Sequence, residues 1–238
     1  MLNSRLLACA NFVQGNFVCD VGTDHAFLPI YLVQNQIVEK AIASDVRKGP
    51  LQAAEQNIFK AGLSDKIQTI LSDGLENVPS ENLTDISIAG MGGETIVHIL
   101  ETCPFSLKKI NLILQPMTKA ELLRKWLYQN GFEIQKELCI PDKKFLYAVM
   151  QVSYTEIRKV PEIQEIYFGK MDLTNKNAYA YAEHQLCQLM KRKAGIFHGE
   201  SVAVPPELND TIKTMAKILG KYDSMQNILT NLGEYDEL

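Results

Sequence analysis

The feature that most constrains the fold of this chain is a regular alternation of short apolar runs with helical stretches over the first 155 residues. Apolar runs of strand length lie at 17–21, 41–45, 67–71, 86–89, 111–114 and 148–152. Stretches with helical spacing lie between them, at 28–35, 49–61, 95–101 and 118–130. A strand followed by a helix, repeated in this way, predicts a parallel sheet with helices on both faces.

The end of this alternating region has a different pattern. Residues 132–140, a P-D-K-K turn at 141–144 and residues 145–152 predict an antiparallel hairpin. The sequence therefore predicts an α/β fold whose seven-stranded sheet is mostly parallel and ends in an antiparallel hairpin. That pattern is typical of the Rossmann-like methyltransferase fold.

The composition shifts near Val160-Pro161, and no convincing strand follows. We expect a catalytic domain at 1–157 and a helical appendage at 158–238. Thr174 is a plausible N-cap for a helix that runs to about Lys193, and Pro205-Pro206 opens another helix. A stripe at spacings typical of a coiled coil predicts an antiparallel coiled-coil hairpin: Leu208, Ile212, Met215, Leu219, Tyr222 and Leu229.

The composition says more about the cellular compartment of this protein than about its activity. Apolar residues make up 46% of the 238, but no run approaches the roughly 20 residues that span a bilayer. The five cysteines form no C-x-x-C pair, which favours a cytoplasmic protein over a disulfide frame or a zinc site. We expect no metal and no membrane. The net charge of −4 argues mildly against nucleic acid, although a local basic patch can act within an acidic total.

Three carboxylates follow three successive predicted strands. Asp20 and Gly22 end the first strand, Asp45 ends the second, and Asp73 follows the third. Carboxyl ends of parallel strands meet at one crevice, where Asp45 is placed to accept from ribose hydroxyls and Asp73 from an adenine amino group. Acids there suit a nucleoside next to a positive sulfonium and would repel a pyrophosphate, which favours S-adenosyl-L-methionine over NAD or ATP.

Each of these acids taken alone could be a turn former or a cap. The ordered set favours a cofactor site, in which Gly22 lets a ligand approach the backbone and nearby amide groups bind it. Further cofactor contacts are expected from neighbouring loop positions: Thr23, His25, Val46, Gly74 and Gly90.

The fourth strand ends in A-G-M-G-G at 89–93, where an acceptor would be met. The glycines leave backbone groups open to a flat ligand, so Met91 and Gly92 are candidate substrate contacts. A simple glycine-rich turn from strand to helix is the alternative. Q-P-M at 115–117 predicts another compact turn on the same rim.

Taken together, these motifs resemble the bacterial tRNA (adenine-22-N1) methyltransferases, the TrmK family. The resemblance rests on D-V-G-T-D-H-A-F-L-P from residue 20, A-S-D-V near 45, S-D-G-L at 72–75, A-G-M-G-G at 89–93 and L-Q-P-M at 114–117. It runs to about residue 155 and continues as architecture, because that family carries a C-terminal coiled-coil hairpin. It implies methyl transfer from S-adenosyl-L-methionine to N1 of an adenosine in the D-arm of tRNA.

Asp24 is the candidate catalytic residue, because a carboxylate near the methionine end of the cofactor can stabilise positive charge that arrives on the base. The alternative is that Asp24 caps the helix beginning near Ala26. His25 is as consistent with a core role as with a functional one.

Contacts with RNA are assigned to Arg5 at the substrate rim and to a basic cluster, Lys191, Arg192 and Lys193. A solvated helix face is the alternative for that cluster. We expect tRNA but no DNA as a partner, and a monomer or weak homodimer. Two other functions stay open: methylation of another acceptor, and binding of S-adenosyl-L-methionine or RNA without catalysis.

Overall fold

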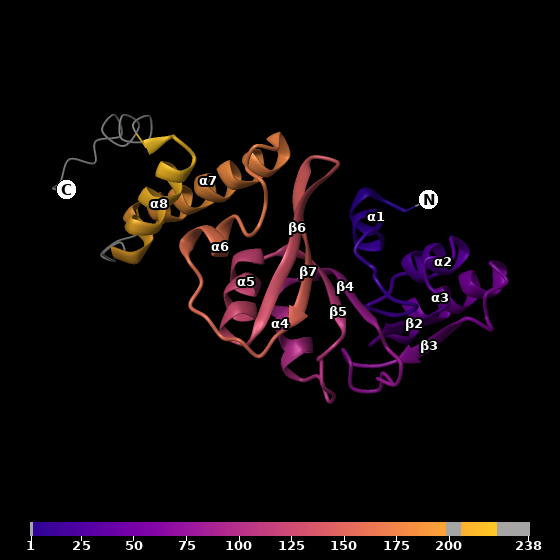
Figure 1. The fold of residues 1–238 in the computed structure, drawn as a ribbon. Coiled ribbons are helices and arrows are strands. Elements are labelled where there is room, and N and C mark those ends of the chain that lie inside the picture. The colour runs from indigo at the N-terminus through magenta and orange to yellow at the C-terminus, as the bar shows by residue number, and fades with distance from the viewer. Residues whose placement is uncertain (1, 199–205, 223–238) are drawn as a thin grey trace.

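The computed structural model describes residues 2–198 and 206–222, and it confirms the predicted seven-stranded sheet (Figure 1). Its strands are β1 (Phe17–Val21), β2 (Lys40–Asp45), β3 (Ile67–Leu71), β4 (Asp85–Gly92), β5 (Asn111–Thr118), β6 (Phe132–Asp142) and β7 (Phe145–Tyr154). The strand order is β3-β2-β1-β4-β5-β7-β6. β1 to β5 run parallel, whereas β7 pairs antiparallel with both β5 and β6.

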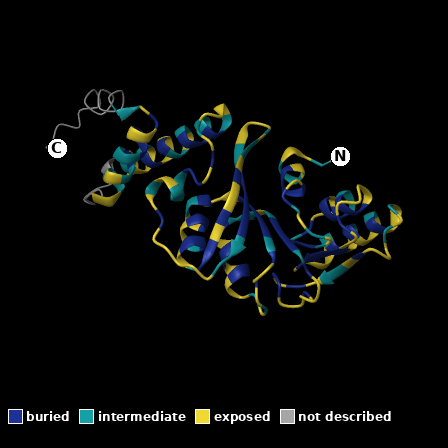
Figure 2. Ribbon diagram, viewed as in Figure 1, coloured by how far each residue is buried: buried dark blue, intermediate teal, exposed yellow. Residues whose placement is uncertain are grey.

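Helices cover both faces of this sheet. One face carries α1 (Ser4–Ala10), α2 (Phe27–Gln34) and α3 (Lys48–Lys60), and the other carries α4 (Gly93–Glu101) and α5 (Ala120–Gln129). Successive side chains of a strand point to opposite faces of the sheet, and each face has its own apolar core. Cys19 and Val21 pack with α4 and α5 on one face, whereas Val18 packs with α1 to α3 on the other. The central strands are accordingly buried on both sides, as Figure 2 shows in dark blue.

Two predictions at the rim of the sheet are wrong. β5 continues through Pro116 to Thr118 instead of turning at 115–117, and α5 begins at Ala120 instead of residue 118. β4 holds this extension by pairing Met91 with Pro116. The proline is tolerated because β7 pairs with β5 only as far as Leu114, so β5 is an edge strand at Pro116.

The C-terminal part contains α6 (Ile163–Tyr167), α7 (Lys176–His198) and α8 (Pro206–Ile218). The Tyr179 hydroxyl donates to the Leu219 carbonyl at 2.9 Å, which joins the start of α7 to the end of α8 and makes the two helices antiparallel. Asn175, not Thr174, caps α7, because its Oδ1 accepts from the Asn177 amide at 2.9 Å.

These three helices share one apolar cluster. Phe168 is fully buried in it together with Met215 of α8 and Ala182 of α7. The cluster therefore joins α6 to the helical pair, and the coiled-coil seam itself stays a prediction because Leu229 lies outside the described residues.

A buried ion pair joins this helical part to the sheet. Arg124 of α5 and Glu137 of β6 are both fully buried, and Arg124 Nη2 lies 2.8 Å from Glu137 Oε1. Arg124 also donates to the carbonyl of Ile166 at 2.9 Å and to the hydroxyl of Tyr181 at 3.2 Å. The amide of Lys170 donates to Glu137 Oε2 at 3.0 Å. The predicted boundary at 157 falls between β7 and α6, and the division into two domains stays a prediction.

Candidate active site

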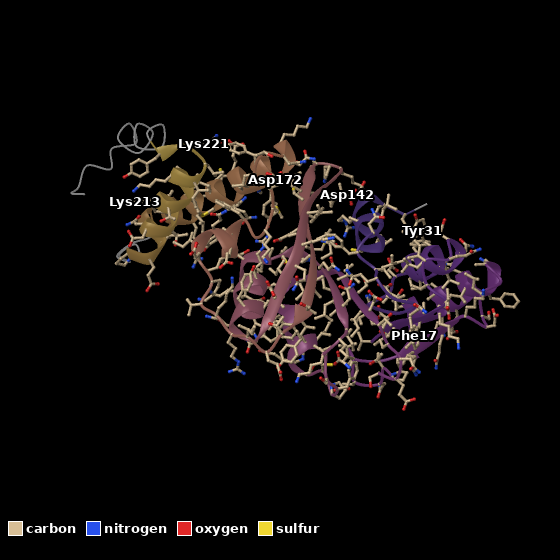
Figure 3. The ribbon with its side chains drawn as sticks, viewed as in Figure 1. Phe17, Tyr31, Asp142, Asp172, Lys213 and Lys221 are labelled. Atoms are coloured by element: carbon tan, nitrogen blue, oxygen red, sulfur yellow. The ribbon has the colours of Figure 1, made fainter. Side chains whose placement is uncertain are left out.

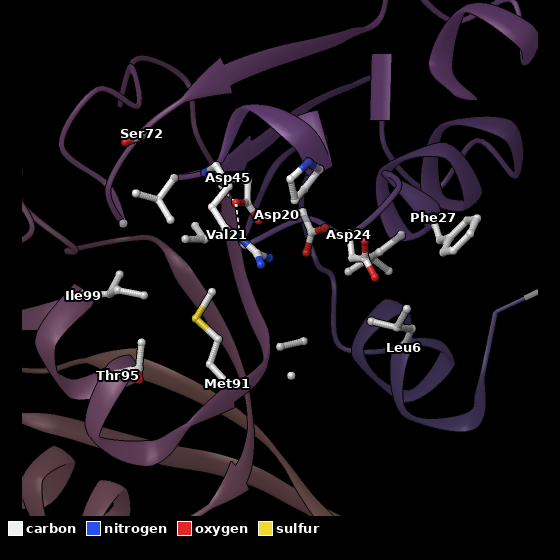
Figure 4. Close-up of a pocket in the computed structure, with 18 of the residues that line it drawn as sticks. Leu6, Asp20, Val21, Asp24, Phe27, Asp45, Ser72, Met91, Thr95 and Ile99 are labelled. Atoms are coloured by element: carbon white, nitrogen blue, oxygen red, sulfur yellow. Dashed lines mark hydrogen bonds and ion pairs between the residues drawn. The ribbon is translucent and has the colours of Figure 1, made fainter. Parts of the chain in front are cut away.

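A cavity of about 850 Å³ opens at the carboxyl ends of β1 to β4. Its floor comes from the strand ends, and its walls come from α1, α2, the β2–α3 loop and α4 (Figure 4). The cavity brings together most of the residues predicted for the site: Arg5, Asp20, Gly22, Asp24, Asp45, Val46, Asp73, Gly74, Gly90 and Met91. Thr23, His25 and Gly92 adjoin lining residues in the chain but do not line it.

Asp20 is the buried acid of the site. It lies one residue before the end of β1, opposite Ser87 of β4, and only 7% of its surface is exposed. Burial raises the pKa of the Asp20 carboxyl from 3.8 to about 6, while the hydroxyls of Thr23 and Ser87 act in the opposite direction. Neither hydroxyl reaches a well-formed hydrogen bond within the described residues. The effect of burial on Asp20 thus outweighs that of the two hydroxyls, and no cation among the described residues pairs with its carboxyl.

The loop after β1 is held by its neighbour strand. The amides of Gly22 and Thr23 both donate to the Ser44 carbonyl at 2.8 Å. These two amides are therefore not free for a ligand, which corrects the expectation that they bind the cofactor. Gly22 has a φ of +72°, and a Cβ there would lie 2.0 Å from the terminal methyl of Met91. The left-handed backbone favours glycine at this position, whereas the Met91 methyl ends a flexible side chain and could move aside.

Asp45 and Asp73 complete the acidic side. Asp45 is 4% exposed, and its Oδ1 accepts from the Arg47 amide at 2.8 Å and from Arg47 Nε at 3.4 Å. Its Oδ2 accepts no hydrogen bond from the described residues and is available to a ligand hydroxyl. Asp73 lies exposed just after β3, and Gly74 packs against Ile99 of α4.

Asp24 does not cap α2. The N-cap is Ala26, which has a left-handed backbone, and the helix receives no side-chain cap. Asp24 lines the cavity with a side chain that is 77% exposed, and its Oδ1 lies 3.3 Å from His25 Nε2. The ring of His25 stacks on Phe27 at a centroid distance of 5.3 Å. The helix-cap alternative for Asp24 is therefore wrong, and a core role for His25 is wrong because that residue is exposed.

The acceptor side is an irregular end of β4. Its pairing with β5 shifts register between Ala89 and Gly92, and Gly90 has a φ of +80°. The Gly90 amide donates to Gln115 Oε1 at 3.1 Å, so this glycine amide is not open to a ligand. Met91 also lines the cavity (Figure 4), and its terminal methyl lies over Gly22 just after β1.

Arg5 lines the cavity but is tied to the protein. Its Nε donates to Asp142 Oδ2 at 2.8 Å, and its Nη1 donates to Gln115 Oε1 at 2.8 Å. The guanidinium also lies 5.1 Å from the centre of the Tyr147 ring. Through these contacts, Arg5 joins α1 to β5 and to the β6–β7 hairpin at the rim of the cavity. A direct contact between Arg5 and the substrate stays a prediction.

The basic cluster on α7 lies elsewhere. Figure 1 places the end of α7, which carries Lys191, Arg192 and Lys193, at the opposite end of the molecule from α1 and α2. The structure therefore does not bring this cluster to the cavity.

Several lining residues were not predicted from the sequence: Asn3, Leu6, Phe27, Leu28, Arg47, Thr95, His98 and Ile99. Asn3 and Leu6 reach the cavity only because α1 packs beside β5 and the hairpin, which no local pattern reveals. Phe27 had a usable signal, because it follows the D-H pair in the same loop and is a large apolar residue, 52% exposed, at the start of a helix.

The strand order and the acidic cavity at the carboxyl ends of the strands define this protein as a Rossmann-like methyltransferase. Residues 2–150 match the methyltransferase domain family. A tRNA (adenine(22)-N(1))-methyltransferase of Bacillus subtilis is 37% identical over 151 residues. That match covers 63% of this chain and 63% of the Bacillus enzyme, so it spans less than two thirds of either protein.

Solved structures extend the likeness to nearly the whole chain. M. capricolum TrmK, solved with S-adenosyl-homocysteine, is 32% identical with a TM-score of 0.76 and covers 93% of this chain and 99% of its own. A Streptococcus pneumoniae protein proposed to be a tRNA (m1A22) methyltransferase is also 32% identical, with a TM-score of 0.80, and covers 92% of this chain and 100% of its own. The chain belongs to the TrmK family of tRNA (m1A22) methyltransferases.

Within the described ranges, no helix has the length and apolar character needed to cross a membrane. The predictions of a cytoplasmic location, of no DNA partner and of a monomer or weak homodimer stay predictions.

Proposed function

We propose that this protein transfers a methyl group from S-adenosyl-L-methionine to N1 of adenosine 22 in the D-arm of tRNA. The observation that carries the proposal is the convergence in one cavity of Asp20, Asp45 and Asp73, which lie at or just beyond the ends of β1, β2 and β3, with the glycine-rich end of β4. Family membership supplies the acceptor, because the Bacillus subtilis relative is a tRNA (adenine(22)-N(1))-methyltransferase.

The residues of the cavity fit the cofactor. The free Oδ2 of Asp45 can accept hydrogen bonds from ribose hydroxyls, and Asp73 can accept from an adenine amino group. The Asp20 carboxylate, which has no cationic partner among the described residues, favours a ligand that carries positive charge. We further propose contacts from Gly22, Val46, Gly74 and Gly90 along the cavity, and from Thr23 and His25 beside it.

The chemical demand on the protein is positioning. S-adenosyl-L-methionine, when bound, supplies a methyl group on a positive sulfur. N1 of neutral adenine carries an in-plane lone pair and no proton, so no side chain has to act as a general base. The cavity walls must hold the base in line and exclude water, and positioning of this kind lowers a barrier by up to roughly 7–11 kcal/mol. The adenosine must also leave its stack, at a cost of a few kcal/mol.

Asp24 is the proposed catalytic residue, because it lines the cavity and has no capping duty. An ionised carboxylate there stabilises the positive charge that the adenine gains or accepts a hydrogen bond from its amino group. Met91 and Gly92 at the end of β4 are proposed to meet the base, with Met91 lining the cavity directly.

Lys191, Arg192 and Lys193 are proposed to bind phosphates of the same tRNA away from the reacting base. Lys191 and Arg192 are exposed on α7. Neutralising the three residues should lower the salt dependence of tRNA binding by about 1 for each phosphate that is no longer bound, without changing cofactor affinity. An unchanged slope would favour a solvated helix face.

The test of the proposed function is transfer of a labelled methyl group to a tRNA transcript, followed by nucleoside analysis. We expect label in 1-methyladenosine, and none when guanosine replaces adenosine 22. Asp45→Asn should abolish most of the transfer, whereas Asp65→Asn, an exposed acid outside the cavity, is the matched control. Label in another nucleoside or acceptor would overturn the proposal, and cofactor binding without any transfer would indicate a binding protein.

A further inference from the structure

The β6–β7 hairpin projects well beyond the sheet. β7 pairs with β5 only between Met150 and Val152, but the two hairpin strands stay paired as far as Asp142 and Phe145. The outer half of the hairpin therefore stands between α1 and α7 (Figure 1), and its tip is exposed (Figure 2). We call Lys143, Lys144 and Phe145 the hairpin tip; all three are exposed.

A continuous chain of contacts fixes this tip beside the cavity. Asp142, labelled in Figure 3, accepts from Arg5 Nε at 2.8 Å, and Arg5 lines the cavity. Arg5 Nη1 donates to Gln115, which in turn accepts from the Gly90 amide. Asp142, which precedes the hairpin tip, is therefore joined to Gly90 at the end of β4 through the side chains of Arg5 and Gln115.

The charge and chemistry of the tip are unlike those of the acidic cavity. Because Arg5 compensates Asp142, Lys143 and Lys144 leave a local excess of positive charge. Phe145 is 51% exposed, and Lys144 Nζ lies 5.3 Å from the centre of its ring. Cations together with an exposed aromatic ring are what proteins use to bind unstacked RNA, because lysines contact phosphates and a ring stacks on a base.

We propose that the hairpin tip binds the RNA strand next to the target adenosine, with both lysines on phosphates and Phe145 stacked on a neighbouring base. The proposal rests on the proposed function, because extraction of an adenosine leaves the adjoining bases exposed for stacking. Arg5 and Asp142 are positioning residues in this arrangement, since they hold the tip at the rim.

The experiment compares Lys143→Gln/Lys144→Gln and Phe145→Ala with a matched control, Lys60→Gln and Phe59→Ala. Phe59 is 78% exposed and Lys60 is exposed at the end of α3, outside the cavity. We would measure kcat and KM for methyl transfer to the tRNA transcript, tRNA affinity against salt concentration, and cofactor affinity by calorimetry.

We expect the double lysine variant to lower the slope of log affinity against log salt by about 2, at about 1 for each phosphate bound. Phe145→Ala should weaken tRNA binding by roughly 5- to 150-fold, the range measured for loss of one stacked base. Both variants should raise KM and leave cofactor affinity unchanged, and the control should match the wild type.

The inference would be overturned if both tip variants kept the tRNA affinity, salt slope and KM of the wild type. In that case, methyl transfer by the wild-type protein would still support the proposed function. Absence of transfer by the parent chain would instead defeat the proposed function. A loss of cofactor affinity in the tip variants would assign the tip to the fold of the cavity and overturn its role in RNA binding.

Discussion

Two buried polar centres of this protein differ in how far their atoms are satisfied. Arg124 and Glu137 are fully buried, and their polar atoms meet one another, two backbone carbonyls, an amide and the Tyr181 hydroxyl. Asp20 is almost as buried, but only the hydroxyls of Thr23 and Ser87 lie beside its carboxyl, and it has no cationic partner among the described residues. A buried charge without partners costs free energy. The contrast separates a centre that joins two parts of the fold from one that is proposed to bind the cofactor.

The largest effect is expected when the buried ion pair of Arg124 and Glu137 is broken. Arg124→Met leaves Glu137 buried with only the Lys170 amide, and loss of one partner of a buried pair costs about 3–5 kcal/mol. Denaturant unfolding should show this loss in the free energy of unfolding. Replacing both partners, with Arg124→Met and Glu137→Leu, should recover much of it, because no lone charge then remains buried. A loss under about 1 kcal/mol in the single variant would contradict the comparison.

The next largest effect is the pH dependence of stability that Asp20 causes. The pKa of Asp20 is raised to about 6, so between pH 4 and pH 6 the folded chain keeps a proton that the unfolded chain has released. The contribution of Asp20 to stability without cofactor is therefore most favourable below this window and falls as pH rises through it, by up to about 3 kcal/mol for a shift of about two units.

Unfolding of the wild type and of Asp20→Asn across this range measures that contribution as a difference. Asp20→Asn should lose the fall, and Asp65→Asn, an exposed acid, should keep it. Cofactor affinity of the wild type should rise over the same window, because the ionised carboxylate favours a cationic ligand. Parallel pH profiles for wild type and Asp20→Asn would show that Asp20 is already compensated in the fold.

A smaller effect separates binding from stability at Asp45. Asp45→Asn should weaken cofactor binding roughly 10- to 100-fold, because hydrogen bonds to charged groups contribute about 1.5–3 kcal/mol. The free energy of unfolding should change by less than about 1 kcal/mol, since only Arg47 contacts this carboxylate among the described residues. Calorimetric titration and unfolding of the same sample give both values. A large loss of stability with unchanged affinity would place Asp45 with the structural centre.

The smallest effect is expected at Asp24. Its side chain is 77% exposed, so solvent screens its charge, and Asp24→Ala should lower kcat by roughly 5- to 30-fold, about 1–2 kcal/mol. Cofactor affinity should stay within about twofold of the wild type, since the change affects the base and not the ribose. Single-turnover methyl transfer measures this step. Wild-type turnover would remove Asp24 from the mechanism.

The sequence predicts the sheet and the acids because each depends on local pattern. Apolar alternation sets the strands, and parallel pairing then carries Asp20, Asp45 and Asp73 to one edge. Local pattern also predicts the apolar stripe of α8, and Ile212 and Met215 on that stripe are buried.

What the sequence hides depends on contacts between distant segments. Arg124 and Glu137 look like ordinary surface charges until α5, β6 and α7 meet. Arg5 looks like a free cation, yet its partners stand 110 and 137 residues away. The amides of Gly22 and Thr23 look open until Ser44 is placed beside them. The sequence shows which residues are polar, but only the folded structure shows which of them already have hydrogen-bond or ion-pair partners within the protein.

Gly22 and Met91 impose a rule on how this site can change through evolution. A side chain at residue 22 meets both a left-handed backbone and the methyl of Met91, which comes from a strand end 69 positions away in the sequence. The methyl of Met91 can move aside because it ends a flexible side chain, but that movement does not relieve the left-handed backbone at residue 22.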